Sequence, residues 1–379
     1  MSKLDELIQE LCPDGVECCP LEQCCNILDR KRKPVTKSAR EAGDYPYYGA
    51  NGIQDYVSDY IFDGTFILVG EDGSVITDRG TPVVTWASGK IWVNNHAHII
   101  EESGDVLLRY LYHYIQTIDV SPLIHGNIPK LTGGDFKALQ IPVPPLPVQR
   151  EIVRILDNFT ELTAELTAEL TARKQQYAYY RDKLLTFGDV RVGVTSDAIQ
   201  RTLGEVCKIS AGGDAPKDSM SKQKTEKYSV PIISNGIGEN ALYGYTDAPK
   251  VEEPAVTVAA RGTIGYAEYR DYPFYPIIRL LTAIPKDSTV VNTKYLYYCL
   301  QGKQYSVPMG GIPQLTAPEL KKVEIPIPSL DVQNRIVKVL DNFDAVCTDL
   351  SSGLPAEIEA RQKQYEYYRD KLLTFTPAD

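Results

Sequence analysis

Residues 149–159 read QREIVRILDNF, and 184 positions later residues 333–343 read QNRIVKVLDNF, with seven of the eleven residues identical. A second pair of stretches matches more closely. Residues 175–187 (QQYAYYRDKLLTF) return as residues 363–375 (KQYEYYRDKLLTF), with eleven of thirteen identical and an offset of 188. The chain is therefore an internal duplication whose second copy has gained four residues between the two stretches.

The repeated unit is long. Weaker matches, such as Asn51-Gly52-Ile53 against Asn235-Gly236-Ile237, carry the duplication into the segments that precede the helical stretches. Solenoid repeats run to roughly 20–50 residues, so a longer unit indicates two tandem domains. We predict a first domain with a short N-terminal helix at 1–140, a central helical region at 141–197, a second domain at 198–325 and a C-terminal helical region at 326–379.

Both helical regions carry the apolar spacing of a coiled coil. From Ile152 to Phe187, apolar or aromatic residues recur mostly at steps of three and four, and the second copy repeats this from Ile336 to Phe375. The four extra residues form a stutter, which keeps the apolar stripe on one side of the helix. The first helix would span roughly 54 Å at about 1.5 Å per residue. Each helix must bury one stripe, and its own copy is the obvious partner.

Prolines bound these helices. Pro142, Pro144, Pro145 and Pro147 are expected to end the strand-like run before the first helix, as Pro326 and Pro328 do in the second copy. Residues 351–355 (SSGLP) predict a kink or short break in the second helix, because proline lacks the backbone donor. The first helix instead carries TAELTAEL at residues 163–170, which are good helix formers.

The segments at about 13–140 and 198–325 have a different pattern. Short runs of Val, Ile, Tyr and Thr, such as residues 66–69 and 255–258, are separated by glycine turns and predict mainly β domains. Residues 110–115 and 295–300 predict short helices. The chain begins with a capped amphipathic stretch from Ser2 to Leu11 that Pro13 and Gly15 terminate. The fold class is therefore α+β, with two mixed, mainly β domains joined by long helices.

Composition restricts the possible functions. No apolar run approaches the roughly 18 residues of a membrane span, and there is no signal-peptide core, so we expect a cytoplasmic protein without a membrane partner. The eight cysteines fit no common zinc pattern and are expected to be free thiols. The net charge of −10 is unusual for a nucleic-acid binder, although residues 190–330 hold 16 basic and 14 acidic side chains. An acidic chain needs local basic patches or a partner that supplies charge.

Catalytic motifs are missing from the sequence. There is no GxxxxGK[ST], HExxH or GxSxG, and Gly236-Ile237-Gly238 is an isolated GxG. His96 and His98 share a strand face by their spacing of two, but no third metal ligand is evident, so a structural role is favoured over a metal site.

Basic and amide side chains are the better candidates for a site. One cluster follows an apolar run near residue 30, a comparable one follows Gly212-Gly213, and both are interpreted as phosphate-contacting loops rather than merely solvated ones. Asn51 and Asn235 precede glycine, where a turn role competes with base reading. Arg79 and Arg261 lie beside glycine after core strands, where a bidentate guanine contact is geometrically possible. The DNA-binding candidates are Lys31, Arg32, Lys33, Asn51, Arg79, Lys90, Lys130, Lys217, Lys222, Lys224, Asn235 and Arg261.

Tyrosines mark the end of each helical region. Tyr177, Tyr180, Tyr365 and Tyr368 lie on the apolar seam and are expected to pack between helices. Tyr179 and Tyr367 lie off the seam. Exposed aromatic side chains on a long helix predict a docking surface for another protein.

Two variable domains that alternate with two near-identical helical regions resemble the specificity subunit of type I restriction-modification systems. The resemblance covers the whole chain. Its motifs are the Pro-rich entry IPVPPLPVQ (141–149) and IPIPSLDVQ (325–333), followed by Gln-x-x-Ile-Val-x-x-Leu-Asp in both copies, and the shared YYRDKLLTF.

The resemblance implies that each variable domain is a target-recognition domain for one half of a bipartite DNA site, and that the helices form an antiparallel spacer. It implies that two modification subunits dock on the helices and that restriction subunits join them. S-adenosylmethionine, ATP and Mg are expected on these partners, with no cofactor and no catalysis on this chain. The chain departs from the family in three features: an acidic first domain, with 13 basic and 20 acidic side chains in residues 1–150; Pro355; and a cysteine cluster of Cys12, Cys18, Cys19, Cys24 and Cys25.

Two alternatives to DNA recognition stay open at this point. A non-DNA scaffold would carry two protein-binding domains on the helical rod, and it would need no basic loops. A two-domain hydrolase or metalloenzyme ranks behind both. The duplicated architecture itself predicts a ruler, in which the helix length sets the distance between two readers on one duplex.

Overall fold

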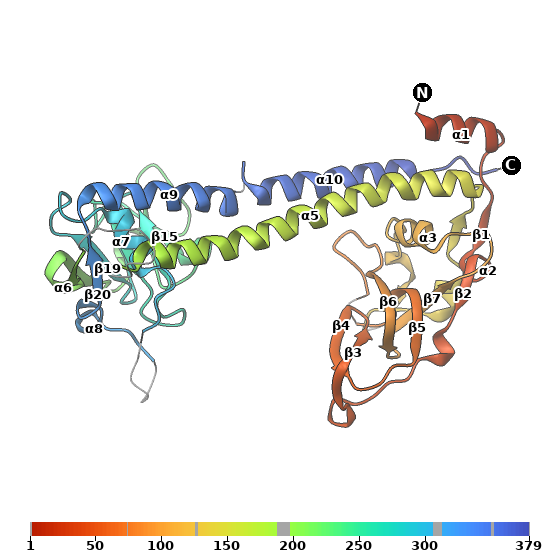
Figure 1. Ribbon diagram of the computed structural model, residues 1–379, viewed down its shortest axis with the longest axis horizontal. Helices are drawn as coiled ribbons and strands as arrows, with labels where there is room; N and C mark the ends of the chain where they lie inside the picture. The colour runs from red at the N-terminus through yellow and green to blue at the C-terminus, as the bar shows by residue number, and fades with distance from the viewer. Residues whose placement is uncertain are drawn as a thin grey trace. The chain divides into compact units, whose positions relative to one another are not determined.

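The computed structural model describes residues 2–73, 75–125, 128–187, 198–305, 313–349 and 352–378. Its contacts divide the chain into two compact units (Figure 1). Unit 1 comprises Met1–Thr167 and Glu357–Asp379, and unit 2 comprises Ala168–Ala356. Each unit holds one mainly β domain together with helical segments from both repeats, which confirms the predicted α+β class.

Unit 1 is built on a six-stranded mixed sheet with the order β2-β7-β5-β6-β3-β4. The pairing is antiparallel except between β3 and β6, which run parallel. The strands are β2 (Cys25–Ile27), β3 (Ala42–Gly49), β4 (Gly52–Val57), β5 (Phe62–Gly70), β6 (Val84–Val93) and β7 (Ala97–Glu102). Two short pairs join β1 (Cys18–Pro20) to β10 (Gln140–Pro142) and β8 (Ile124–His125) to β9 (Lys130–Leu131).

Both faces of the central strand β5 are covered. Ile67 and Val69 pack with the helices in one core cluster, and Phe66 and Leu68 pack in a second cluster with strands β6 and β7. A strand buried on both faces has a continuous apolar run, as Phe66 to Val69 does. The helices of this unit are α1 (Lys3–Leu11), α2 (Leu21–Cys24), α3 (Leu108–Ile115) and α4 (Gly133–Lys137), with 3-10 turns η1 (Asp29–Lys31), η2 (Lys37–Ala39) and η3 (Ser121–Leu123). Ser2 caps α1 through a capping box with Asp5, as the sequence predicted.

Unit 2 divides its strands between two four-stranded sheets, β12-β19-β16-β17 and β13-β15-β14-β18, and a pair β11-β20. The strands are β11 (Ile199–Thr202), β12 (Cys207–Ala211), β13 (Met220–Ser221), β14 (Val230–Ile233), β15 (Leu242–Thr246), β16 (Ala255–Val258), β17 (Ala267–Arg270), β18 (Tyr275–Pro276), β19 (Leu281–Pro285) and β20 (Glu324–Ile327). The short helices are α6 (Leu203–Val206), α7 (Thr293–Leu300) and α8 (Ala317–Lys321), with 3-10 turns η5 (Lys217–Ser219) and η6 (Gly238–Ala241). Helices α3 and α7 confirm the two predicted short helices.

The long helices are α5 (Leu146–Leu185), α9 (Leu330–Thr348) and α10 (Leu354–Leu372). Helix α5 begins earlier than its apolar spacing suggested, and Pro147 lies within its first turn. The expectation that Pro147 and Pro326 end the preceding strand-like runs is therefore wrong. Pro147 lies in the first turn of α5, where no backbone donor is needed, and Pro326 lies inside β20, paired with Gln200. The predicted break in the second helix is confirmed: α9 ends at Thr348 and α10 begins at Leu354. Leu350 and Ser351 lie outside the described residues.

Each unit joins helical segments from the two repeats, and the aromatic contacts are equivalent. In unit 1, Phe159 of α5 stacks on Tyr368 of α10 with ring centroids 5.3 Å apart. In unit 2, Tyr180 of α5 stacks on Phe343 of α9 at 5.9 Å. The prediction that each helical region packs against its own copy is confirmed by these contacts. In unit 1 the two segments run in opposite directions along each other (Figure 1).

A buried glutamine attaches each domain to its helix. The Gln149 carboxamide accepts from the Leu107 N–H at 2.9 Å and donates to the carbonyls of Asp105 and Pro144. Its counterpart Gln333 accepts from the Asn292 N–H and donates to the carbonyls of Val290 and Pro328. Both side chains are fully buried. Three hydrogen bonds satisfy the carboxamide, which explains why a polar residue stands in this apolar position.

Among the described residues, no helix combines the length and the apolar character that a membrane crossing requires.

Candidate nucleic-acid interface

Asn235 ties three loops together at one end of the second domain. Its Nδ2 donates to the carbonyl of Ile278 at 2.6 Å, and its Oδ1 accepts from the Ala260 N–H at 2.7 Å. Its own carbonyl accepts from the Thr263 hydroxyl at 2.8 Å. These contacts engage both ends of the carboxamide, so they support the turn-forming role of Asn235 over base reading.

Arg261 lies on the second of these loops. Its Nε and Nη2 both donate to Oε1 of Gln314, at 3.0 and 2.6 Å. The two-nitrogen fork that would read a guanine is therefore held by a side chain of the same domain. A contact of Arg261 with DNA stays a prediction that requires this pair to open.

Three exposed lysines border the same end of the domain. Lys222 donates to the carbonyl of Tyr243 at 3.0 Å, and its Nζ lies 3.7 Å from the centre of the Tyr243 ring. Tyr243 in turn lines a hollow of about 750 Å³ together with Lys217 and Ile278. Lys224 is exposed on the adjoining loop. The structure thus connects Lys217, Lys222 and Asn235 through Tyr243 and Ile278.

In the first domain, the exposed candidates are Lys31, Lys33, Asn51 and Lys90. The Lys33 ammonium lies 5.8 Å from the Trp92 ring centre, and the Lys90 ammonium lies 4.7 Å from that of Tyr60. Asn51 occupies the turn between β3 and β4. The same hairpin exposes Ile53 and Tyr56, by 47% and 53%. This combination of exposed amide, apolar and basic groups suits a surface that reads bases and contacts phosphates.

Two other candidates of the first domain are engaged in its interior. Arg32 donates through Nη1 to Glu71 at 2.6 Å and to the carbonyl of Ala97 at 2.6 Å. Only 12% of the Arg32 side chain is exposed. Lys130 pairs with the other oxygen of Glu71 at 3.1 Å. These contacts support a structural role for Arg32. Lys130 also pairs with Glu71, but it is about half exposed and can in addition contact phosphate.

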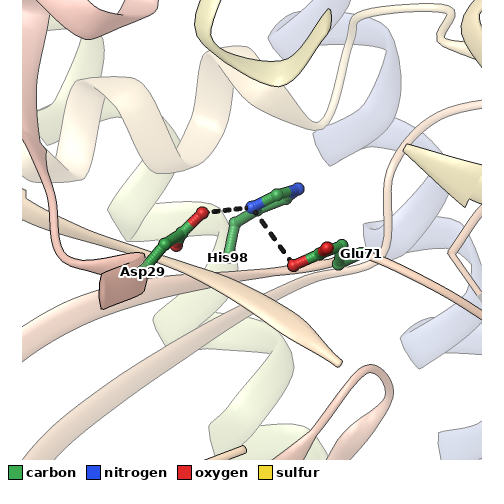
Figure 2. Close-up of side chains that lie close together, drawn as sticks. All are labelled: Asp29, Glu71 and His98. Atoms are coloured by element: carbon green, nitrogen blue, oxygen red, sulfur yellow. Dashed lines mark hydrogen bonds and ion pairs between the residues drawn. The ribbon is translucent and has the colours of Figure 1, made fainter. Parts of the chain in front are cut away.

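Glu71 belongs to a partly buried charged cluster with Asp29 and His98 (Figure 2). Nδ1 of His98 lies 2.6 Å from Asp29 and 3.7 Å from Glu71, and Nε2 lies 3.0 Å from the carbonyl of Leu131. Burial alone would raise the pKa of Asp29, but the hydrogen bond with His98 and its charge hold that pKa below its ordinary value.

Side-chain cations already lie against the carboxylates of this cluster. The Leu131 carbonyl can only accept, so Nε2 of His98 donates to it, and Nδ1 faces the Asp29 carboxylate. Arg32 and Lys130 already supply cations to Glu71. His96 pairs instead with Asp72 at 2.5 Å, so His96 and His98 contact different carboxylates. Among the described residues, Asp29, Glu71 and His98 are the ones brought within ligand distance of one another, and these contacts favour the structural role. All eight cysteines are free thiols.

Arg79 faces a helix. Its Nη2 pairs with Glu366 of α10 at 2.6 Å, although 59% of the Arg79 side chain is exposed. An exposed pair of this kind contributes little to stability, about 0–1 kcal/mol. Phosphate could compete for this guanidinium, and its contact with DNA stays a prediction.

The tyrosines on the apolar seam are enclosed only in part: Tyr180 and Tyr368 stack across the helix pair, as expected, but each is 40% exposed. Tyr177 donates to Gln301 and Tyr365 lies 2.9 Å from Nδ1 of His113, so both join helix to domain. Tyr179 and Tyr367 are 54% and 62% exposed, and each lies edge-on to the next tyrosine in the chain.

Comparison with known proteins identifies the family. The family model described as the type I restriction modification DNA specificity domain matches residues 13–173 and again residues 196–360. The chain belongs to this family. A Haemophilus influenzae protein assigned to the type I restriction enzyme specificity subunits is 38% identical over 95% of this chain and 96% of its own length. An Escherichia coli type I restriction enzyme specificity subunit is 32% identical over 79% of this chain and 80% of its own length.

Solved structures of this specificity family share the fold. The S subunit of a type I restriction-modification system from M. genitalium aligns with a TM-score of 0.59 at 15% identity, covering 94% of this chain and 96% of that one. Membership in the specificity family makes DNA target recognition within a restriction-modification complex the function of the chain, with DNA and other subunits of the system as partners. The comparisons give the scaffold alternative no support.

Some residues beside these candidates were not predicted from the sequence. Tyr243 and Ile278 line the second domain's hollow, and Ile53 and Tyr56 lie on the strand that follows Asn51. The search for candidates relied on charge and on residues beside glycine. Exposed apolar residues in strands give no such signal, because the same residue types fill the core.

Proposed function

We propose that each domain of this specificity subunit reads one half of a bipartite site in double-stranded DNA, and that the helices set the number of unread base pairs between the halves. The observation that carries this proposal is the equivalence of the two domain attachments. Gln149 and Gln333 make equivalent sets of three hydrogen bonds at the start of α5 and α9. Two domains attached in the same way to repeated helices suit two separate readings of one duplex.

We propose further that two modification subunits dock on the repeated helices, at surfaces that include Tyr179 and Tyr367, and that restriction subunits join them. S-adenosylmethionine, ATP and Mg would be held by those partners, and the site of action would be the cytoplasm, where the chromosome is accessible.

The partners would also supply positive charge. This chain carries a net charge of −10, and phosphate attraction dominates DNA affinity.

Sequencing of methylated bases tests this function. Cells that express the chain with its candidate modification subunit should acquire a methylated adenine motif with two specified halves and a fixed gap. Cells that express the modification subunit alone are the control and should lack the motif. A motif without a gap, or one that does not depend on this chain, would contradict the proposal.

A further inference from the structure

The second domain contains a tight turn with an unusual backbone. Ile278 and Arg279 have φ angles of 52° and 62°, in the left-handed region. The Leu280 N–H donates to the carbonyl of Ile277 at 3.0 Å, which closes a four-residue turn around them. Two positive φ angles in the middle of such a turn define type I′.

The residues at these two positions oppose this conformation. Type I′ turns strongly prefer Asn-Gly, because both central residues must adopt positive φ. A β-branched residue such as isoleucine is a genuine outlier there. A strained backbone conformation of this kind persists only where contacts with the surrounding structure hold it in place. Such strain is concentrated at functional sites.

Three hydrogen bonds from elsewhere in the domain hold the turn. The Ile278 N–H donates to the carbonyl of Gly213 at 2.8 Å, and the Arg279 N–H donates to that of Gly212 at 3.0 Å. The Asn235 side chain donates to the Ile278 carbonyl at 2.6 Å. A Cβ on Gly212 would lie 2.7 Å from the Pro276 carbonyl carbon, so this approach requires glycine.

The turn directs both side chains to the surface. Ile278 is 48% exposed, and Arg279 is exposed as well. Among the contacts of the described residues, no hydrogen bond or ion pair engages the Arg279 guanidinium, whereas Arg261 is bound to Gln314. Ile278 also lines the hollow that contains Lys217 and Tyr243. The strained isoleucine therefore adds no buried side chain to the core.

We propose that Ile278 and Arg279 are specificity-determining residues of the second domain that read base edges in the major groove. Arg279 would donate to O6 and N7 of a guanine, and Ile278 would pack against the methyl group of a neighbouring thymine. This inference rests on the proposed function and assigns the residues that carry it out.

The surroundings favour bases over phosphates as the target. Asp214 and Asp218 line the same hollow as Lys217. Their carboxylates repel phosphates but can accept hydrogen bonds from the amino group of cytosine. An isoleucine gains nothing from a phosphate, which needs a donor or a charge.

The decisive variant is one that should fold better than the natural chain. Ile278→Asn combined with Arg279→Gly gives the turn its preferred residues, and we expect the Tm to rise by about 2–4 °C. In complex with the modification subunit, this variant should bind the cognate duplex roughly 10- to 100-fold more weakly. Its methylated motif should become degenerate in one half and stay unchanged in the other.

Two further variants separate the alternatives. Arg279→Lys keeps the charge but loses the bidentate fork, so it should also relax that half of the motif. Arg201→Ala removes an exposed arginine from β11 and should leave the motif intact. If the unmodified complex produces no bipartite motif, the proposed function fails. If it produces one and the double variant keeps both halves and the affinity, or if Arg279→Lys behaves like the unmodified chain, the assignment of this turn fails.

Discussion

At the scale of single residues, charge and position in the sequence did not reveal which side chains face solvent. Arg32 and Lys130 were candidates for phosphate contact because they are basic and lie in loops. Both pair with Glu71, which is far from each of them in the sequence. Asn235 illustrates the same limit, because its hydrogen-bond partners Ala260 and Ile278 are brought to it only by the folded domain. The sequence also did not predict that Gln149 and Gln333 are buried and attach each domain to its helix, although both lie in the motif that identifies the family.

His113 is expected to make the stability of unit 1 depend on pH. Unit 2 has a tyrosine in place of this histidine. Its Nε2 lies 2.8 Å from Asp157 and its Nδ1 lies 2.9 Å from the Tyr365 hydroxyl, which suits a neutral ring that donates to the carboxylate and accepts from tyrosine. Burial lowers the pKa of His113 below 6.5, and the Asp157 hydrogen bond only partly opposes this. In unit 2, Tyr298 donates to the equivalent Asp341.

Because the pKa of His113 is lower in the folded chain, the unfolded chain binds more protons, and the stability of unit 1 falls as the pH drops through 6.5. We expect His113→Gln, which keeps a donor for Asp157, to show a smaller loss of Tm between pH 8 and pH 5.5 than the unmodified chain. Thermal denaturation of the full chain measures this. His96→Gln, which removes an exposed histidine, is the control. Equal pH dependence in the His113 variant and the unmodified chain would contradict the assignment.

At the scale of elements, the three- and four-residue spacing was sufficient to predict the long helices, and SSGLP was sufficient to predict the break between α9 and α10. The Pro355 ring causes no conflict, because it lies in the first turn of α10. The strands and their order were not predictable in detail. The turn at Ile278 shows why: residues 277–280 (IIRL) contain no glycine, proline or asparagine that would signal a turn, and the hydrogen bonds that hold the turn involve Gly212, Gly213 and Asn235.

The helix α5 offers a direct test of the spacer. It runs without interruption from Leu146 to Leu185 and contains the repeated TAEL units at residues 163–170. Deletion of residues 167–170 should shorten the helix by about 6 Å and rotate one end by roughly 40° relative to the other. At about 3.4 Å per base pair, we predict that the unread gap of the methylated motif shortens by one or two base pairs while both halves persist. Thr163→Ala, which preserves the length, should leave the gap unchanged, and an unchanged gap in the deletion variant would refute the spacer role.

At the scale of the whole molecule, the proposal that modification subunits dock on the repeated helices predicts two equivalent docking surfaces. Tyr367 belongs to unit 1 and Tyr179 to unit 2, and each exposed ring is braced edge-on by a neighbour, Tyr368 or Tyr180, that stacks across the helix pair. A rigid exposed aromatic loses little conformational entropy on binding, which is why tyrosine is frequent among the residues that dominate interfaces. Because Tyr367 and Tyr179 belong to different units, the proposal predicts that a change in one affects one modification subunit only.

We therefore expect Tyr179→Ala and Tyr367→Ala each to weaken the binding of one modification subunit by at least about tenfold, the effect of losing roughly 1.4 kcal/mol. The other subunit should bind normally, so that each single variant forms complexes with one modification subunit and the double variant forms almost none. Titration followed by native mass spectrometry distinguishes these stoichiometries. Glu161→Ala removes an exposed side chain from α5 and should keep two subunits bound. If both tyrosine variants still bind two subunits with unchanged affinity, the modification subunits dock elsewhere, and the exposed tyrosines need another explanation.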